Sequence, residues 1–171
     1  MARAEQLIPF ILRWEGGFSD HPADRDGATN RGVTLATFQQ FYGADRTADD
    51  LRAMTDEQWL HIFREGYWNR WQADRIASQS LANLLVDWVW ASGSHGITRP
   101  QRILGVEADG IVGEQTLAAL AALAARAPEP LFHQLKAARI AFVEGIVREN
   151  PSQKVFLRGW KNRIEAIAWV G

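Results

Sequence analysis

Several kinds of residue and pattern are missing from this chain of 171 residues, and each absence excludes a class of protein. Cysteine is absent, so the chain has neither a disulfide framework nor a thiol nucleophile. No basic block stands out and the net charge is −1, which argues against nucleic acid as a partner. The four histidines do not show the His-Glu-x-x-His spacing of zinc peptidases.

Long apolar segments are also missing. The stretch Leu7–Leu12 is too short to span a bilayer, and it lacks the small-residue cleavage site of a secretory signal. We therefore expect a chain that is made in the cytoplasm without a signal peptide and that does not insert stably into a membrane.

Apolar residues are nevertheless plentiful enough for a folded core. They make up 47% of the chain, and its length suits one domain, or one domain with a small attached lobe. Eight tryptophans are many for this length. Buried tryptophans are usually structural, but flat aromatic side chains also line carbohydrate clefts. The sequence alone does not divide Trp68, Trp71, Trp88 and Trp90 between these two uses.

Helical spacing of apolar residues dominates the chain and predicts a mainly α-helical domain. A first helix, with Leu7, Ile11 and Glu15 on one face, should end at Gly16-Gly17. Residues 18–32 form a polar loop with room for a short hairpin, and residues 93–120 form a small turn-rich unit. The remaining helices are expected at 34–42, 55–69, 80–91, 129–149 and 152–170.

Glu15 is the most unusual residue of this pattern. It continues an apolar stripe beside Trp14 at the C-terminal end of its helix, where a negative charge opposes the helix dipole and partial burial opposes ionisation. Both effects favour a protonated carboxyl, which the general acid of a glycosidase needs near neutral pH. The alternative is a structural glutamate that pairs with Arg13 or Arg31.

The polar loop supplies candidate partners for Glu15. Asp24 lies nine residues after Glu15, and Thr29 lies five residues after Asp24. An inverting glycosidase holds a second carboxylate about 6.5–9.5 Å from the acid with a water between them, and a neighbouring hydroxyl can help to hold that water. Asp20, Asp24 and Asp26 can also be turn formers, the usual role of aspartate in such loops.

A distinctive set of residues thus follows the first helix: Glu15-Gly16-Gly17-Phe18, Asp24, Gly27, Thr29 and Gly32-Val33-Thr34. This set resembles the signature of the glycoside hydrolase 108 family, which is described as N-acetylmuramidases found in phage endolysins and secretion activator proteins. The order and spacing of its Glu, Asp and Thr are similar to those of the catalytic triad in phage lysozymes. The resemblance implies a mainly α, lysozyme-like helical fold in which Glu15, Asp24 and Thr29 are catalytic.

Further matching residues run through the second half: Tyr67-Trp68, Asp87, Ala91-Ser92-Gly93, Gln101, Leu104-Gly105, Asp109-Gly110, Gly113, Thr116-Leu117, Gly159-Trp160 and Asn162-Arg163. They are similar to the part of the family that is described as a predicted peptidoglycan-binding region. The resemblance covers nearly the whole chain and implies a lysozyme-like catalytic lobe at 1–92 and a helical lobe at 93–171, packed as one compact unit.

Two positions bear on how roles are assigned from the family pattern. Asp26-Gly27 stands where the family usually has Gly-Gly, so Asp26 competes with Asp24 for the role of base. Asp20 stands where the family often has Asn or Asp, which makes it a candidate substrate contact. The full set of expected glycan contacts is Phe18, Asp20, Tyr67, Trp68 and Gln101.

Two polar residues of the second half also have structural interpretations. Gln101 can hold the loop and helix start that shape the second lobe. Asp87 lies within an apolar helix, and a buried aspartate usually caps or hydrogen-bonds a neighbouring loop, so we favour that role over catalysis.

The function expected from these residues is hydrolysis of the β-1,4 bond between N-acetylmuramic acid and N-acetylglucosamine. Glu15 would protonate the glycosidic oxygen, while Asp24, with Thr29, would position and activate the attacking water. No metal or organic cofactor is needed. We expect a monomer that binds peptidoglycan glycan strands and reaches the periplasm by a holin-type or other route without a signal peptide. The rivals are a non-catalytic peptidoglycan-binding module and a structural module whose loop at 18–32 binds a partner protein.

Overall fold

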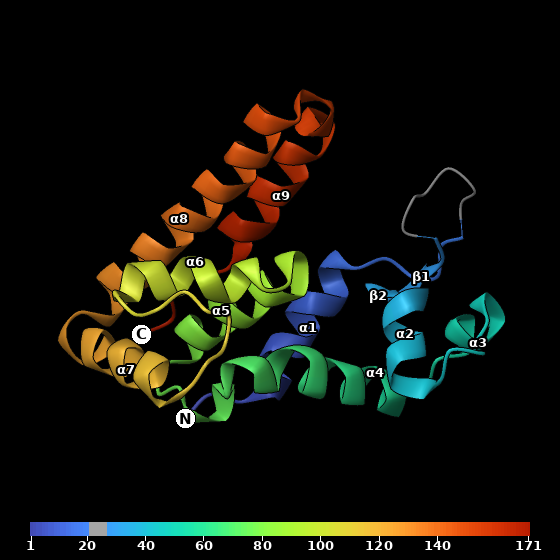
Figure 1. Cartoon of the computed structure of the whole chain (residues 1–171), viewed down its shortest axis with the longest axis horizontal. Helices are drawn as coiled ribbons and strands as arrows, with labels where there is room; N and C mark the ends of the chain where they lie inside the picture. The colour runs from blue at the N-terminus through green and yellow to red at the C-terminus, as the bar shows by residue number, and fades with distance from the viewer. Residues whose placement is uncertain (21–26) are drawn as a thin grey trace. The chain divides into compact units, whose positions relative to one another are not determined.

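The computed structural model describes residues 1–20 and 27–171 and confirms a mainly α-helical, lysozyme-like fold (Figure 1). Its elements are α1 (Ala4–Trp14), β1 (Thr29–Asn30), β2 (Val33–Thr34), α2 (Leu35–Tyr42), α3 (Ala48–Arg52), α4 (Asp56–Phe63), the π-helix η1 (Arg64–Trp68), the 3₁₀ helices η2 (Asn69–Trp71) and η3 (Ala73–Arg75), α5 (Gln79–Ser92), α6 (His95–Leu104), α7 (Glu114–Arg126), α8 (Pro128–Glu149), the 3₁₀ helix η4 (Pro151–Gln153) and α9 (Lys154–Ala166). Within the described ranges, no helix has the length and apolarity that crossing a membrane requires.

Tertiary contacts divide the chain into two units. The hairpin unit comprises Ala4–Tyr67, and the helical unit comprises Met1–Arg3 together with Trp68–Gly171. The motifs predict a different boundary, between a catalytic lobe at 1–92 and a helical lobe at 93–171. That assignment of lobes stays a prediction.

The hairpin unit begins with the amphipathic helix α1. Leu7 and Ile11 are buried, at 1% and 0% exposure, as their helical spacing predicts. The helix ends at Trp14, and the backbone N–H of Glu15 still donates to the carbonyl of Ile11 at 3.0 Å. The predicted end of this helix, just before Gly16-Gly17, is confirmed.

A short antiparallel hairpin follows in the same unit, as the sequence allowed. Thr29 pairs with Thr34 and Asn30 with Val33, and the two-residue turn between the strands is Arg31-Gly32. Both turn residues have positive φ, 49° and 80°, which is the requirement of a type I′ hairpin turn. Thr34 then caps α2, because its hydroxyl accepts a 3.1 Å hydrogen bond from the backbone N–H of Thr37.

The helical unit is built around α5, which packs against α6 and α8, while α8 also packs against α7 and α9 (Figure 1). Asp87 on α5 is fully buried and forms ion pairs with Arg139 of α8 at 2.8 Å and with Arg163 of α9 at 2.7 Å. Asp87 therefore joins three helices, rather than capping a loop as the sequence suggested. Burial opposes its ionisation, but the two guanidinium charges outweigh that effect and lower the pKa of Asp87.

The close contact between α5 and α6 depends on Gly96. A Cβ at this position would lie 2.4 Å from the backbone nitrogen of Val89, so only glycine allows the observed approach. One turn later, Pro100 has no N–H to donate to the carbonyl of Gly96. That carbonyl instead accepts a 3.1 Å hydrogen bond from the indole N–H of the buried Trp71.

The structure differs from the sequence-based expectations in three segments. The segment 93–120 was expected to be turn-rich, but it contains the helix His95–Leu104 and the start of α7. The helix expected at 55–69 begins at Asp56 as its capping box predicts, then widens into a π-helix after Phe63. The short helix Ala48–Arg52 was not predicted.

Candidate active site

A backbone bridge joins the two ends of the polar segment that follows α1. Ser19 and Thr29 exchange two N–H to carbonyl hydrogen bonds, each 2.8 Å long. Phe18 and Asp20 flank this bridge along the chain. Ser19 lies four positions after Glu15, so their Cα atoms are at most about 14 Å apart. The bridge therefore holds Thr29 in the neighbourhood of the C-terminal end of α1.

Thr29 is fixed from its other side by the next two residues of the hairpin, whose part in holding it the sequence did not predict. The side-chain amide of Asn30 donates to the carbonyl of Leu51, at 2.9 Å, at the end of α3. Arg31 donates to Asp56 at 2.6 Å and to the carbonyl of Met54 at 2.7 Å. These contacts tie the hairpin to the helices after it. The signal in the sequence was Gly32 directly after two polar residues, a pattern typical of a tight hairpin turn.

Glu15, the predicted acid, lies at the C-terminal end of α1. It is half-buried and follows directly on the last residue of α1, where the free carbonyls of the helix carry partial negative charge. The exposed pair Gly16-Gly17 follows, and a Cβ at either glycine would meet nothing within 4 Å. Neither packing nor positive φ requires glycine here, so the pair leaves the backbone beside Glu15 open to close approach.

The other predicted residues of the polar segment have different surroundings. The half-buried ring of Phe18 has the guanidinium of Arg52 stacked over it, 4.4 Å from the ring centroid. Asp20 is exposed. Asp24 and Asp26, the two candidates for the base, lie outside the described residues.

Tyr67 and Trp68 lie in the π-helix η1, at the end of one unit and the start of the other. Tyr67 is half-buried. Trp68 is 0% exposed, and its indole N–H donates to Asp74 at 2.9 Å. Its burial favours the structural use of this tryptophan over direct contact with a glycan.

Gln101, on α6, is also 0% exposed, and its side-chain amide is fully engaged. Its NH₂ donates to Asp109 at 2.9 Å and to the carbonyl of Ile111 at 3.0 Å, and its oxygen accepts from the backbone N–H of Gly110 at 2.9 Å. Hydrogen bonds from the backbone of Ile111 and from Gln101 lower the pKa of Asp109. The structure thus supports the structural interpretation of Gln101, which holds the loop before α7.

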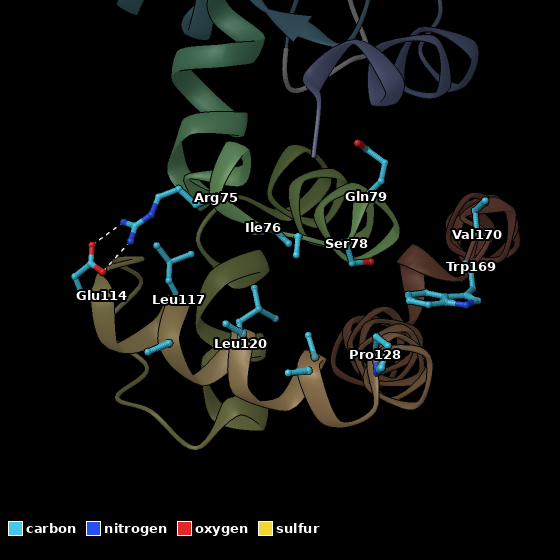
Figure 2. A pocket seen from close by; sticks show the side chains of 16 residues that line it. Arg75, Ile76, Ser78, Gln79, Glu114, Leu117, Leu120, Pro128, Trp169 and Val170 are labelled. Atoms are coloured by element: carbon cyan, nitrogen blue, oxygen red, sulfur yellow. Dashed lines mark hydrogen bonds and ion pairs between the residues drawn. The ribbon is translucent and has the colours of Figure 1, made fainter. Parts of the chain in front are cut away.

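An apolar groove of about 720 Å³ lies in the helical unit (Figure 2). Arg75 and Glu114 form a bidentate ion pair at one end, with distances of 2.6 and 2.8 Å, and Trp169 stands at the other. The hydrogen bond from Arg75 lowers the pKa of Glu114. Leucine and alanine side chains of α7 form the wall between these ends. The groove is lined by none of the residues that the sequence predicts as catalytic.

The hairpin unit therefore contains the described members of the predicted acid and base site. It has a half-buried carboxyl at a helix end, an open glycine backbone beside it, and a threonine returned to the same region by the backbone bridge. A carboxyl group can protonate a leaving oxygen, and a hydroxyl can hold a water for attack.

The chain is similar to known proteins in both of its halves. Residues 8–93 match the family model described as Glycosyl hydrolase 108, and residues 95–165 match the model described as Predicted Peptidoglycan domain. The structure is similar to that of Brucella abortus SagA, with a TM-score of 0.83 and 31% sequence identity over 95% of this chain and 90% of that one. No curated protein matches the chain. The chain therefore belongs to the glycosyl hydrolase 108 family, and it is a peptidoglycan hydrolase with a peptidoglycan-binding region after its hydrolase domain.

Proposed function

We propose that the chain is an N-acetylmuramidase that cleaves the β-1,4 bond between N-acetylmuramic acid and N-acetylglucosamine. In this mechanism, the carboxyl of Glu15 protonates the glycosidic oxygen. Asp24 acts as the base that activates a water, and the hydroxyl of Thr29 helps to position that water. Two carboxyl groups with a water between them imply inversion at the anomeric carbon.

The observation that carries this proposal is the place of Glu15 at the end of α1, followed by the bridge between Ser19 and Thr29. Helix α1 fixes the acid, because the backbone of Glu15 is still bonded to Ile11. The bridge fixes Thr29, and the contacts of Asn30 and Arg31 hold the strand that carries it. The family match over residues 8–93 supports a glycoside bond as the target.

The decisive test is the replacement Glu15→Gln, assayed by mass spectrometry of the products from purified peptidoglycan. Loss of the general acid should lower turnover by about 10²–10⁴-fold. The midpoint of thermal unfolding should stay unchanged or rise, because a negative charge at a helix C-terminus opposes the helix dipole. Glu57→Gln, an exposed carboxyl in the first turn of α4, is the matched control and should keep parental activity.

The products distinguish this function from its rivals. Muramic acid at the new reducing ends supports a muramidase, whereas glucosamine there would contradict the bond assignment. Parental turnover by Glu15→Gln would contradict the mechanism. A parent chain that binds peptidoglycan and releases nothing would be a binding module instead.

The base can be assigned by comparing Asp24→Asn with Asp26→Asn. The proposal requires the larger loss for Asp24→Asn, and the reverse order would move the role to Asp26. Thr29→Val should lower turnover while leaving the bridge intact, because the bridge uses only backbone atoms. NMR of the first-formed anomer tests inversion.

We further propose that the chain acts as a monomer on the cell wall, which it reaches from the cytoplasm by a holin-type or other route. A role as a phage endolysin and a role in opening the wall for secretion both agree with this chemistry. Release of the chain on expression with and without a holin would separate the two routes.

A further inference from the structure

The far end of the α8–α9 hairpin carries an exposed apolar patch. Within the helical unit, α8 and α9 run side by side and extend beyond α5 and α6, with η4 joining them (Figure 1). Val155 and Phe156, in the first turn of α9, are 78% and 52% exposed. The ring of Phe156 stacks on that of Trp160, with 5.9 Å between the centroids and 26° between the planes. Soluble proteins seldom leave adjacent large apolar side chains in water without a use for them.

Cations flank this patch on the same helix. The basic residues of α9 outnumber its one acid, Glu165, although the net charge of the whole chain is −1. Lys161 pairs with Glu144 at 2.9 Å, and Arg163 pairs with the buried Asp87. Lys154 and Arg158 remain exposed, and no ion pair of theirs occurs in the described part of the chain.

The helical repeat places these groups in an order around α9. At about 100° per residue, Lys154 and Arg158 form one edge, Phe156 and Trp160 form the other, and Val155 lies between them. We call these five residues the tip surface. Phe156 and Arg158 point about 160° apart around the helix, so the tip surface has an aromatic pair on one side and positive charge on the other.

This combination fits the chemistry of peptidoglycan. The apolar faces of sugar rings stack on aromatic side chains, and the stem peptides on alternate sugars carry carboxylates that attract Lys and Arg. The tip surface also lies within residues 95–165, which match the predicted peptidoglycan domain without any residue being assigned to binding. We propose that the tip surface is where the helical unit binds peptidoglycan, with the aromatic edge on a sugar and the cationic edge on stem carboxylates.

The proposal rests on peptidoglycan being the substrate, and it predicts a binding surface that is separate from Glu15. The test is co-sedimentation of the full chain with purified insoluble peptidoglycan, in the Glu15→Gln background so that the polymer stays intact. Val155→Ser with Phe156→Ser should weaken retention about tenfold, which corresponds to about 1.4 kcal/mol. Both side chains are exposed, so the thermal midpoint should change little.

A second pair of variants tests the contribution of the cationic edge to binding. Lys154→Gln with Arg158→Gln should weaken retention at low salt, and the difference from the parent should shrink at about 1 M salt, where the screening length is about 3 Å. Arg102→Gln with Arg126→Gln removes the same charge from other exposed sites of the helical unit and should leave retention unchanged. Ile111→Ser is the control for the apolar change, because Ile111 is 70% exposed and distant in sequence from the tip surface.

Three results would overturn the proposal. Parental retention by both double variants would show that the tip surface does not bind peptidoglycan. Binding to vesicles of phosphatidylglycerol and phosphatidylethanolamine that depends on Phe156, without retention on peptidoglycan, would assign the surface to a membrane. A dimer that Phe156→Ser dissociates would assign it to a second copy of the chain. The readout is retention and not the bond cut, so failure of the tip surface and failure of the Glu15 mechanism appear in different measurements.

Discussion

The replacement Asp87→Asn should destabilise the helical unit strongly, because it removes a buried carboxylate that forms ion pairs with Arg139 and Arg163. Asp87 is 0% exposed, and the side chains of Arg139 and Arg163 are 2% and 13% exposed. Asparagine keeps the shape of the side chain but takes from the buried guanidinium of Arg139 the carboxylate that lies 2.8 Å away. Breaking a buried ion pair from one side costs about 3–5 kcal/mol. For a chain of this length, that lowers the melting temperature by roughly 6–20 °C.

Thermal and urea unfolding followed by circular dichroism would measure the loss. Asp56→Asn is the matched control, since the carboxyl of Asp56 also pairs with an arginine, Arg31, but is 98% exposed. An exposed pair contributes at most about 1 kcal/mol. The two variants therefore separate burial from the mere loss of a charge.

The loss of stability caused by Asp87→Asn should also depend on pH in a defined direction. The folded-state pKa of Asp87 is lowered from its ordinary value of 3.8, so its contribution is fully present above that value and is lost as pH falls through the folded-state pKa. The gap in stability between parent and variant should be constant near neutral pH and shrink below about pH 4. Stability within about 1 kcal/mol of the parent at pH 7 would refute the reasoning. Loss of turnover without loss of stability would move Asp87 into the chemistry.

Two further changes probe the helical unit. Gly96→Ala should lower the free energy of unfolding by about 3 kcal/mol or more, because the added methyl meets backbone atoms of α5 that cannot move aside. Gly159→Ala, with open space around it, should raise the melting temperature slightly. Equal melting temperatures for the two variants would contradict the contact between Gly96 and α5. Gln101→Leu should cost about 1–3 kcal/mol, because it leaves the N–H of Gly110 without its acceptor, and faster hydrogen exchange at that amide would report the loss.

The parts of the fold that the sequence predicted are those that local rules control. Thr34 and Thr55 begin helices in the structure because each hydroxyl accepts from the backbone N–H three residues later. The apolar run from Ser80 was recognisable because α5 is buried on nearly every side. The end of α1 was marked by the change from an apolar stripe to glycine.

The parts that the sequence did not predict depend on tertiary contacts. The segment of α6 looks turn-rich because it contains Gly96 and Pro100, yet the glycine serves close packing on α5 and the proline is compensated by Trp71. The partners of Asp87 lie 52 and 76 residues away, beyond the reach of any local pattern.

For the candidate site, spacing and resemblance identified Glu15 and Thr29, but not the residues that hold the hairpin. Asn30 and Arg31 act on carbonyls of the later helices, so their role is visible only once the chain is folded. Trp68 and Gln101 matched family motifs, and both are buried and hydrogen-bonded inside the helical unit. A motif marks residues that matter without showing whether they contact the substrate.

The hydrogen bond between Trp71 and Gly96 has an evolutionary consequence. While residue 100 is proline, replacement of Trp71 leaves the buried carbonyl of Gly96 without a donor, so substitution of the tryptophan is disfavoured. Any other residue at position 100 would bring its own N–H to that carbonyl and release the constraint. The order of substitution therefore matters: position 100 must change before position 71 can, and lineages that keep the proline should keep the tryptophan.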